Sequence, residues 1–590
     1  MVDQPEFPKP ATSFTAQRNS AAVVDFDDAT DTAAASRGLV AQHPTGLIER
    51  DGWPVWNTAN HDFLRTDDPA PDTVHPGLWR HGQLNAIHVL FEVAPGVWQA
   101  RGYDISNITF IEADSGWLII APLTAEECAR ACLELANQHL GERPVSAVIY
   151  THSHLDHFGG MLGVTTRAAA ARGDVRVIAP EGFMHEAVGE NVRAGPSMGR
   201  RSMYQFGPLL PFGPQGQVDA GLGKTIPLGT SALVAPTETI SETGAELDVD
   251  GVRIVFQNTP DAEAPSEMNF FFPDKRLLCM AENCTHTLHN LYPIRGAQIR
   301  DSLAWSKYIH EALRMWGDHS DIMFASHHWP RFGGDDVRGF LELQRDVYRW
   351  MHDQTLRLAN HGNTADEISE QLSSLPACFS HQSHVQGYYG TVSHNVRSVY
   401  HRYLGWYDGN PANLHPHPPV EAAHRYVEMM GGADEVVTKA QRSFDDGDYR
   451  WVVEVLGHVI FHDPEHRAAR SMSADAMEQL GYAAESSTWR NAYLMGAHEL
   501  RHGAIQIGRG RVSPMASGMT GEQLVDMMAV RFDPTRCERG ELSIDWTVTD
   551  LAADGTPTHR LSVSNAAVHH DDDIAGLPNA DVAVTFTRSA

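Results

Sequence analysis

The feature that most constrains this chain is the segment Thr151-His-Ser-His-Leu-Asp-His157, which directly follows the short apolar run Pro144–Tyr150. That run has the length and composition of a buried β-strand. At its carboxyl end, four strong metal ligands fall within six positions: His152, His154, Asp156 and His157. Imidazole and carboxylate groups suit zinc and related divalent ions. A His-x-His pair can hold one ion, and the turn that follows directs Asp156 and His157 toward a second. The segment therefore predicts a metal site rather than a solvated loop.

Strands and helices alternate around this motif. Asn107–Glu112 and Gly116–Ala121 predict a β-hairpin, and Thr124 begins a capping-box pattern that predicts a helix to Leu140. Gly141 would end that helix. Two later strands are predicted at Val252–Gln257 and Asn269–Phe272. This order predicts an α/β or α+β sandwich rather than a helical bundle.

The pattern changes twice more along the 590 residues, which argues for about three domains. Residues 1–334 would carry the motif, with 1–90 as an irregular arm and Gly207–Gly229 as a loop that lines a pocket. Residues 335–482 are predicted to be helical, with a helical hairpin over 448–480. The region begins with apolar residues at helical spacing: Val337, Phe340, Leu343, Val347, Trp350 and Met351. Residues 488–590 are predicted to contain a small sheet, because apolar residues alternate over Leu542–Val548 and Val582–Phe586.

The charge balance narrows the function. Lys and Arg number 45 against 75 Asp and Glu, a net charge of −30 that repels nucleic-acid phosphates and anionic lipid. An anionic substrate would therefore need local cations at its site. The N-terminal residues show no secretory signal, and no apolar run reaches the roughly 18 residues of a membrane span. We expect a cytoplasmic protein that binds no nucleic acid and does not span a membrane.

Several longer blocks of sequence, together with the motif, resemble one known family. The blocks are Ala179–Met184, Leu209–Gly223, Ala262–Met268, Met280–Asn283 and Tyr403–Leu414. From about residue 80 to its C-terminus, the chain resembles the zinc-dependent alkylsulfatases of the metallo-β-lactamase superfamily. These include enzymes that hydrolyse dodecyl sulfate and inverting secondary-alkylsulfatases. The resemblance implies an α+β fold with a metallo-β-lactamase αββα sandwich, an α-helical dimerisation domain and a small sterol-carrier-protein-like α+β domain. It also implies a homodimer, for which the apolar stripe from Val337 to Met351 would be the contact.

The same resemblance implies two zinc ions per chain and assigns their ligands. One ion would be held by His152, His154 and Glu263. The other would be held by Asp156, His157 and His327. Glu282 would lie between the ions and bridge them. His328 stays open as an alternative to His327, which the family motif favours, and on chemistry alone Glu267 can replace Glu263.

Hydrolysis of a sulfate ester fits such a pair of ions, because water between two dications loses a proton easily. The resemblance assigns the sulfate group to Asn290 and Arg295, and a guanidinium can contact an oxyanion through two hydrogen bonds. A catalytic general acid can protonate the departing sulfate. His394 and His286 are the candidates, and the resemblance favours His394. In this family water attacks carbon and the C–O bond breaks, which we expect here.

The leading hypothesis is therefore metal-dependent hydrolysis of a small amphiphilic alkyl sulfate to an alcohol and inorganic sulfate. Two alternatives stay open: a non-catalytic alkyl- or lipid-binding scaffold, and a metallo-hydrolase that acts on another ester or a lactam. The chain departs from the family at two places. Ala121 stands where relatives usually carry Asp, which predicts modestly weaker metal binding. The last domain stops at Ala590, earlier than this fold usually does, so we expect its apolar groove for the alkyl chain to be incomplete.

Overall fold

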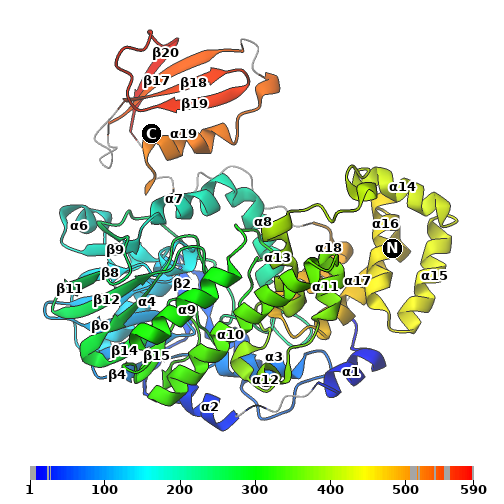
Figure 1. Cartoon of the computed structure of the whole chain (residues 1–590), viewed down its shortest axis with the longest axis horizontal. Coiled ribbons are helices and arrows are strands. Elements are labelled where there is room, and N and C mark those ends of the chain that lie inside the picture. Colours follow the sequence, from blue (N-terminus) through cyan, green and yellow to red (C-terminus); the bar gives the residue numbers. More distant parts are fainter. Residues whose placement is uncertain are drawn as a thin grey trace.

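The structure is a computed structural model that describes residues 8–22, 26, 28–504, 515, 518–536, 540–549 and 558–587. Two β-sheets pack face to face in the first half of the chain (Figure 1). The first sheet has the order β1-β4-β5-β6-β7-β8-β9-β10: Leu39–Ala41, Val89–Ala94, Val97–Arg101, Ile108–Glu112, Trp117–Ile120, Val145–Ile149, Arg176–Pro180 and Glu238–Ile240. The second sheet runs from β11 to β16 in sequence order: Glu246–Val249, Val252–Asn258, Met268–Phe272, Leu277–Cys279, Ile322–Phe324 and Arg331–Phe332.

Alternation along the strands buries both faces of the first sheet. On β7, Leu118 and Ile120 pack between the two sheets, whereas Trp117 and Ile119 belong to the apolar layer on the outer face. Successive side chains of a strand point to opposite faces, so one strand supplies two separate layers of the core. A strand that is buried on both faces has a continuous apolar sequence, and the run Pro144–Tyr150 before the motif is an example.

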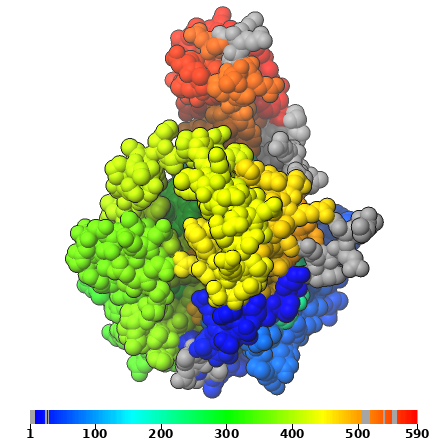
Figure 2. All heavy atoms as spheres, turned by 90° about the vertical axis from the view of Figure 1, so that its right-hand side faces the viewer, coloured from blue at the N-terminus to red at the C-terminus, as the bar shows by residue number. Residues whose placement is uncertain are grey.

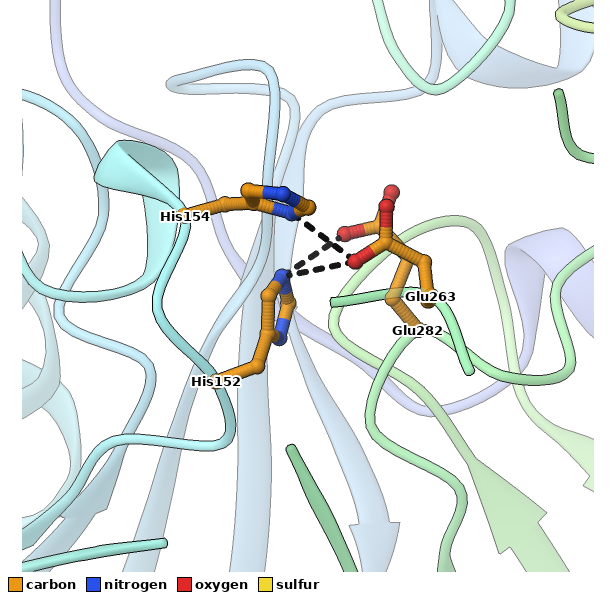
Figure 3. A group of neighbouring side chains, drawn as sticks. All are labelled: His152, His154, Glu263 and Glu282. Carbon is orange, nitrogen blue, oxygen red and sulfur yellow. Dashed lines mark ion pairs between the residues drawn. The ribbon is translucent and has the colours of Figure 1, made fainter. Parts of the chain in front are cut away.

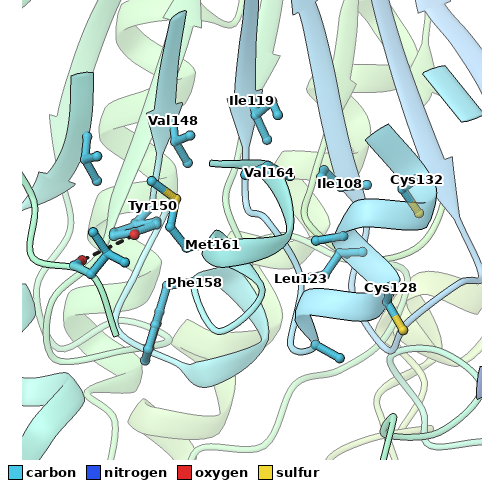
Figure 4. Packing of buried hydrophobic residues seen from close by; sticks show 14 of the residues in the cluster. Ile108, Ile119, Leu123, Cys128, Cys132, Val148, Tyr150, Phe158, Met161 and Val164 are labelled. Atoms are coloured by element: carbon cyan, nitrogen blue, oxygen red, sulfur yellow. Dashed lines mark hydrogen bonds between the residues drawn. The ribbon is translucent and has the colours of Figure 1, made fainter. Parts of the chain in front are cut away.

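Helices close both outer faces and complete the sandwich. α4 (Glu126–Leu140) and α5 (Met161–Val164) pack on the first sheet, where Cys128 and Met161 share a cluster with Val148 of β8 (Figure 4). α9 (Ser302–Trp316) and α10 (Gly334–Ala359) cover the second sheet. The predicted αββα sandwich is confirmed. The β6–β7 hairpin and strands β8, β12 and β13 also lie where the sequence predicts them.

One local prediction is wrong at the start of α4. The helix begins at Glu126, and no side chain caps it, because its N-cap residue is Ala125. The Thr124 hydroxyl instead donates to Asp104 Oδ1 over 2.7 Å, and the Thr124 backbone N–H donates to Asp104 Oδ2 over 3.1 Å. A buried carboxylate thus takes the hydroxyl that the capping box would use. The end of the helix is as predicted, at Gly141, whose φ of 104° favours glycine.

The N-terminal arm is more regular than its composition predicts. It contains α1 (Ser13–Ser20), α2 (Asp28–Ser36), α3 (Pro76–Asn85), β2 (Leu47–Arg50) and β3 (Trp53–Asn57), and its strand β1 pairs with β4 at the edge of the first sheet. Just before α1, the Thr12 backbone N–H donates to Gln479 Oε1 over 2.9 Å, which ties the arm to the helical layer (Figure 2). The arm therefore packs on both the sandwich and the helices.

The apolar stripe at residues 337–351 lies in this chain's own core, which corrects its interpretation as a dimer contact. Four of its members on α10 are at most 1 % exposed: Val337, Phe340, Val347 and Met351. They pack in one cluster with residues of α9, the second sheet and α13 (Val392–Leu404). Helical spacing shows that one face is buried but does not show against what. Further helices follow: α11 (Ala365–Gln371), α12 (Ala377–Ser380), α14 (Pro419–Met429), α15 (Ala433–Asp445), α16 (Tyr449–His462), α17 (Arg467–Tyr482) and α18 (Ser487–His502). α16 and α17 form the predicted helical hairpin.

The C-terminal part is a helix on a small sheet. α19 (Gly521–Ala529) packs on strands in the order β19-β18-β17-β20: Ala567–Asp571, Thr558–Ser564, Leu542–Val548 and Val582–Phe586. β17 and β20 are the two predicted strands. Leu524 and Met527 of α19 also pack on the outer layer of the first sheet, so α19 lies between the small sheet and the sandwich (Figure 1).

Three expectations about domains and location stay predictions. α18 begins one residue before the range expected for the C-terminal domain, 488–590, and extends into it, yet it packs on α17 of the helical layer. The expected shortening of the last domain concerns an end whose residues 588–590 lie outside the described ones.

Within the described ranges, none of the helices combines the length and the apolar character needed to cross a bilayer. The cytoplasmic location is untested.

Candidate metal centre and substrate cavity

The motif lies where strand ends from both sheets meet. β8 ends at Ile149, and the backbone of His152 forms an isolated antiparallel bridge with Glu267, just before β13. After the motif, Gly160 packs against the backbone that precedes α4. A Cβ atom at Gly160 would lie 2.2 Å from the carbonyl oxygen of Pro122. Only glycine allows this close approach, which holds the turn and the side chains that it carries.

Two groups of side chains gather at this place, and Glu282 belongs to both. The first group contains His152, His154, Glu263 and Glu282, whose ligand atoms lie within 4.8 Å of one another. His152 Nε2 lies 3.3 Å from Glu263 Oε2 and 3.1 Å from Glu282 Oε2 (Figure 3). His154 Nδ1 lies 2.8 Å from Glu263 Oε2. Glu263 follows β12 and Glu282 follows β14, so three strand ends supply this group.

The second group contains Asp156, His157, Glu282 and His327. His157 Nε2 lies 3.1 Å from Asp156 Oδ2 and 3.1 Å from Glu282 Oε2. His327 follows β15, and its Nδ1 donates to the carbonyl oxygens of Ile105 and Leu222 over 3.1 and 3.2 Å. Because these carbonyls hold the proton on Nδ1, Nε2 is the nitrogen that faces the group and that a metal ion would bind in place of a proton.

The chemistry of both groups fits divalent metal ions. His157 Nε2 and His327 Nε2 face each other at 3.3 Å. His152 Nε2 and His154 Nδ1 both approach Glu263 Oε2, and this carboxylate oxygen forms no well-aligned hydrogen bond with the residues that the structure describes. Buried polar atoms in this state cost free energy that a bound cation removes. Imidazole nitrogens and carboxylate oxygens are the ligand set of zinc and related ions.

The geometry bears on the two alternatives that the sequence leaves open. Glu267 lies outside both groups, because its Oε2 accepts from the backbone N–H of Glu263 over 2.9 Å. Burial, followed by the charges of Glu263 and Glu282, raises the pKa of Glu267 well above its usual range. His328 also lies outside, with its Nε2 bonded to the carbonyl oxygen of Gly221 over 3.1 Å. Glu263 and His327 therefore belong to the two groups. Glu267 instead accepts from the backbone N–H groups of Glu263 and Glu282 and so links the two segments that carry these ligands.

Two residues that sequence reasoning missed support the buried carboxylates. His289 Nε2 donates to Glu282 Oε1 over 2.9 Å, and Arg300 Nη2 lies 2.5 Å from Glu263 Oε1. Burial favours a raised pKa for Glu282, but the charge of His327 and hydrogen bonds from three histidines outweigh it and hold that pKa well below its usual range. The only signal for His289 is its place next to Asn290, in the segment 285–295 that follows Glu282. Arg300 lies beyond that segment and gives no signal.

A cavity of about 400 Å³ opens onto both groups. The charged part of its lining includes Asp156, Glu190, Glu263, Glu282, Arg295 and Arg300. The apolar part includes Met198, Phe206, Leu222, Ile226 and Pro227. Met198 and Phe206 lie on α8 (Gly195–Phe206), and the other three lie in the loop formed by residues 207–229. The prediction that residues 207–229 line a pocket is thus confirmed.

Arg295 reaches the cavity, whereas Asn290 is not part of its lining. Arg295 Nη1 donates to the Glu190 carboxylate, and burial lowers the pKa of the guanidinium to about 10, which leaves it protonated at neutral pH. The Asn290 Oδ1 accepts from Arg300 Nη1 over 2.5 Å. Of the two residues assigned to sulfate, Arg295 lines the cavity, whereas Asn290 contacts Arg300, which lines the cavity as well.

Neither candidate for the general acid is part of the cavity lining. His394 lies on α13, where its Nε2 donates to the carbonyl oxygen of Tyr292 over 2.5 Å, and burial lowers its pKa. His286 packs against Trp329 with ring centroids 4.3 Å apart, and burial lowers its pKa well below its usual range. Their catalytic role stays a prediction.

Ala121 lies at the end of β7 in the apolar cluster between the two sheets. Its φ of 53° is left-handed, a conformation that costs roughly 1–2 kcal/mol for most residues and less for Asp. The alanine therefore leaves strained backbone where relatives usually carry Asp. Weaker metal binding at this position stays a prediction.

Three known protein families match successive parts of the chain. The metallo-beta-lactamase superfamily matches residues 101–327. The family described as alkyl sulfatase dimerisation matches residues 364–503, and the alkyl sulfatase C-terminal family matches residues 512–590.

Individual relatives are similar over nearly the whole chain. A linear primary-alkylsulfatase from Pseudomonas sp. is 46 % identical over 588 residues, which cover 99 % of this chain and 86 % of the relative. An (R)-specific secondary-alkylsulfatase from Pseudomonas sp. is 44 % identical, with 98 % and 87 % covered. The solved structure of the inverting sec-alkylsulfatase Pisa1 from Pseudomonas sp. superimposes with a TM-score of 0.94 at 43 % identity, covering 99 % of this chain and 92 % of that one. The chain therefore belongs to the alkylsulfatase family of the metallo-β-lactamase superfamily, and its ligand groups support a metal cofactor.

Replacing Arg300 tests the balance of charge at Glu263. Arg300→Ala should destabilise the metal-free protein by about 3–5 kcal/mol, because it leaves a buried carboxylate without its cation. Denaturant unfolding measures this loss, which should shrink when divalent metal is added, since a bound cation replaces the missing charge. Arg253→Ala breaks an exposed pair with Glu246 and is the matched control, with an expected loss below about 1 kcal/mol. Equal losses in the two variants would contradict this role of Arg300.

Proposed function

We propose that this protein hydrolyses alkyl sulfate esters to an alcohol and inorganic sulfate at a centre of two zinc ions. The observation that carries the proposal is a single cavity that joins both metal-ligand groups, a buried arginine and an apolar wall. Membership of the alkylsulfatase family supports it. A scaffold without turnover has no need for unsatisfied ligand atoms in its core, because they reduce stability.

Seven side chains would hold the two ions. One ion would bind His152, His154 and Glu263, the other would bind Asp156, His157 and His327, and Glu282 would contact both. When bound, the ions would supply positive charge that makes water acidic enough to react at neutral pH. The chain fixes the ligands beforehand, since Arg300 holds Glu263 and His289 holds Glu282.

Arg295 would bind the sulfate group of the ester. Its side chain is 15 % exposed and lines the cavity, so a guanidinium–sulfate contact there would be largely shielded from water. A direct contact of Asn290 with sulfate would use its Nδ2 group, because its Oδ1 accepts from Arg300. Arg295 therefore supplies the local positive charge that an anionic substrate needs in a chain with a net charge of −30.

The apolar part of the cavity lining would determine how the alkyl chain of the substrate is oriented. With sulfate at Arg295, the alkyl chain would lie along Met198 and Phe206 of α8 and Ile226 of the facing loop. The ester carbon then lies between the anchored sulfate and the apolar wall, within reach of water held at the metal-ligand groups. From the family resemblance, we propose attack at this carbon and cleavage of the C–O bond, with sulfate as the leaving group.

Hydrolysis in isotopically labelled water tests both the function and the bond that breaks. The purified protein should release sulfate from dodecyl sulfate or from a secondary octyl sulfate, and the label should enter the alcohol. A chiral secondary ester, if accepted, should give the inverted alcohol. Mass spectrometry of the alcohol and the sulfate measures the label. Label in the sulfate would contradict attack at carbon, and the absence of sulfate release from every alkyl ester would contradict the function.

Metal analysis tests the ligand assignment. The purified protein should contain close to two zinc ions per chain, and a strong chelator should abolish turnover. Asp156→Ala removes a ligand of the second group only and should lower the zinc content toward one per chain, as measured by plasma mass spectrometry. Asp174→Ala, an exposed aspartate that pairs with Arg172, is the control and should keep both ions. A folded wild-type protein that binds no divalent metal would refute the proposal.

We propose a homodimer formed through the outer helices of the dimerisation region. Because the stripe at 337–351 is buried within the chain, another surface must supply the contact. Large exposed apolar side chains lie at the end of α13 and just after it, on α14 and on α16: Tyr403, Leu404, Trp406, Val420, Tyr426, Met429, Trp451 and Phe461. Of these helices, α14 and α16 pack together at one end of the molecule (Figure 1). An apolar patch of this kind is typical of an interaction site.

Sedimentation tests the dimer. The wild-type protein should sediment at twice its chain mass of 65.1 kDa. Met429→Asp should shift the protein toward the monomer, because Met429 is 86 % exposed on this patch and burying a charge in an interface costs several kcal/mol. Trp53→Asp is the control, since Trp53 is 76 % exposed but lies on β3 in the N-terminal arm. A monomeric wild-type protein at micromolar concentration would exclude the dimer.

A further inference from the structure

Glu190 contacts both the proposed sulfate site and the proposed metal site. It lies in the short π-helical segment η3 (Gly189–Arg193) between α7 (Phe183–Val188) and α8. One carboxylate oxygen, Oε1, accepts from Arg295 Nη1, and the other, Oε2, lies 3.4 Å from His154 Nε2. The side chain is 13 % exposed and lines the cavity. A carboxylate thus holds a position on Arg295 that a sulfate oxygen would take.

Arg295 does not depend on Glu190 for its place. Its backbone N–H donates to Gln205 Oε1 over 2.9 Å, and its Nη1 also donates to the carbonyl oxygen of Gly296 over 3.1 Å. The other arginine of the cavity lining, Arg300, lies 2.5 Å from Glu263 and is committed to it. Arg295 is therefore the cation that an incoming anion can engage, and Glu190 is the group that competes for it.

We propose that Glu190 is a specificity-determining residue, which competes for Arg295 and favours a monoanionic alkyl sulfate over the dianionic sulfate product. This inference rests on the proposed function. Coulomb repulsion is proportional to the charge of the ligand, so a carboxylate repels a dianion twice as strongly as a monoanion at the same distance. The ester carries one negative charge and free sulfate carries two at neutral pH. Glu190 therefore weakens the binding of product more than the binding of substrate.

The contact with His154 keeps this charge close to the bound anion. His154 Nδ1 faces Glu263 in the first ligand group, so its Nε2 is the nitrogen that points outward. The outward nitrogen of a metal-binding histidine commonly donates to a carboxylate, which also orients the ring. Held by this contact, Glu190 stays in the cavity wall when sulfate displaces it from Arg295, and it continues to repel the product.

Glu190→Gln tests the proposal in the full-length, zinc-loaded protein. Glutamine keeps an oxygen for His154 but loses the negative charge. Isothermal titration calorimetry with inorganic sulfate and with methyl sulfate gives the dissociation constants of a dianion and a monoanion. Relative to wild type, the variant should gain affinity for both anions unequally. Its fold-gain for inorganic sulfate should be at least about ten times its fold-gain for methyl sulfate. Zinc content should stay unchanged.

Glu186→Gln is the matched control. It removes the same charge one turn earlier, on α7, where Glu186 accepts from Gln298 and lines an adjoining cavity rather than the one that Arg295 lines. Its affinities for both anions should equal those of wild type. The proposal is overturned if Glu190→Gln leaves sulfate affinity unchanged, if both anions gain equally, or if Glu186→Gln gives the same change.

A second variant keeps the proposal testable if Glu190→Gln does not fold. Glu190→Ala also removes the carboxylate and should give the same larger gain for inorganic sulfate than for methyl sulfate, and equal gains for the two anions overturn the proposal. Calorimetry needs no turnover, so its outcome is separate from that of the function. A protein that releases no sulfate from alkyl esters refutes the proposed function, whereas the titrations still decide the role of Glu190.

Discussion

Three carboxyl groups are buried side by side where the two sheets meet, and much of the local structure compensates for them. They are Glu263, Glu267 and Glu282, each at most 3 % exposed. Removing one ionised carboxylate from water costs several kcal/mol unless a cation or several hydrogen bonds replace the water. Each has a different compensation: Arg300 for Glu263, histidines that include His289 for Glu282, and backbone N–H groups with a raised pKa for Glu267. The remaining unsatisfied atoms call for metal ions, so metal binding and folding stability are coupled at this site.

The parts of this site that are local in sequence could be predicted, and the parts assembled over distance could not. The four motif residues follow one strand within six positions, and that spacing alone indicates a metal site. Glu263, Glu282 and His327 follow three other strands, and their distance along the chain carries no such information, so they came only from the resemblance to a family. Arg300 and Glu190 were missed because a single charged residue in an irregular segment looks the same in a sequence whether it is solvated or buried in an ion pair.

The same division applies to the fold. Periodicity found the buried strands and the long helix α10, because burial of a face leaves a repeating pattern whatever the partner is. It could not name the partner, and for that reason the stripe at 337–351 was assigned to a second subunit rather than to α9 and the second sheet. The capping box at Thr124 failed for a related reason. The Thr124 side chain could either cap the helix by accepting from a backbone N–H or donate to a residue elsewhere in the chain. It donates to Asp104, which the tertiary structure brings close. Local rules hold until a distant residue offers a better contact.

The two arginines of the cavity explain how a chain with a net charge of −30 can both keep its fold and bind an anion. Salt screens exposed charges over about 8–10 Å, so the excess of surface acids has little weight inside the cavity. There, Arg295 and Arg300 supply the positive charge of the chain itself against four acidic residues of the lining, and bound metal ions would add more. Both are paired with carboxylates, but the pairs differ in burial. Arg300 is 4 % exposed and its partner Glu263 is 1 % exposed, whereas Arg295 and Glu190 are 15 % and 13 % exposed. Breaking the deeper pair would leave two charges without water, while opening the shallower one exchanges a carboxylate for another anion at little cost. The deeper arginine therefore serves stability, and the shallower one is suited to the exchange of substrate and product.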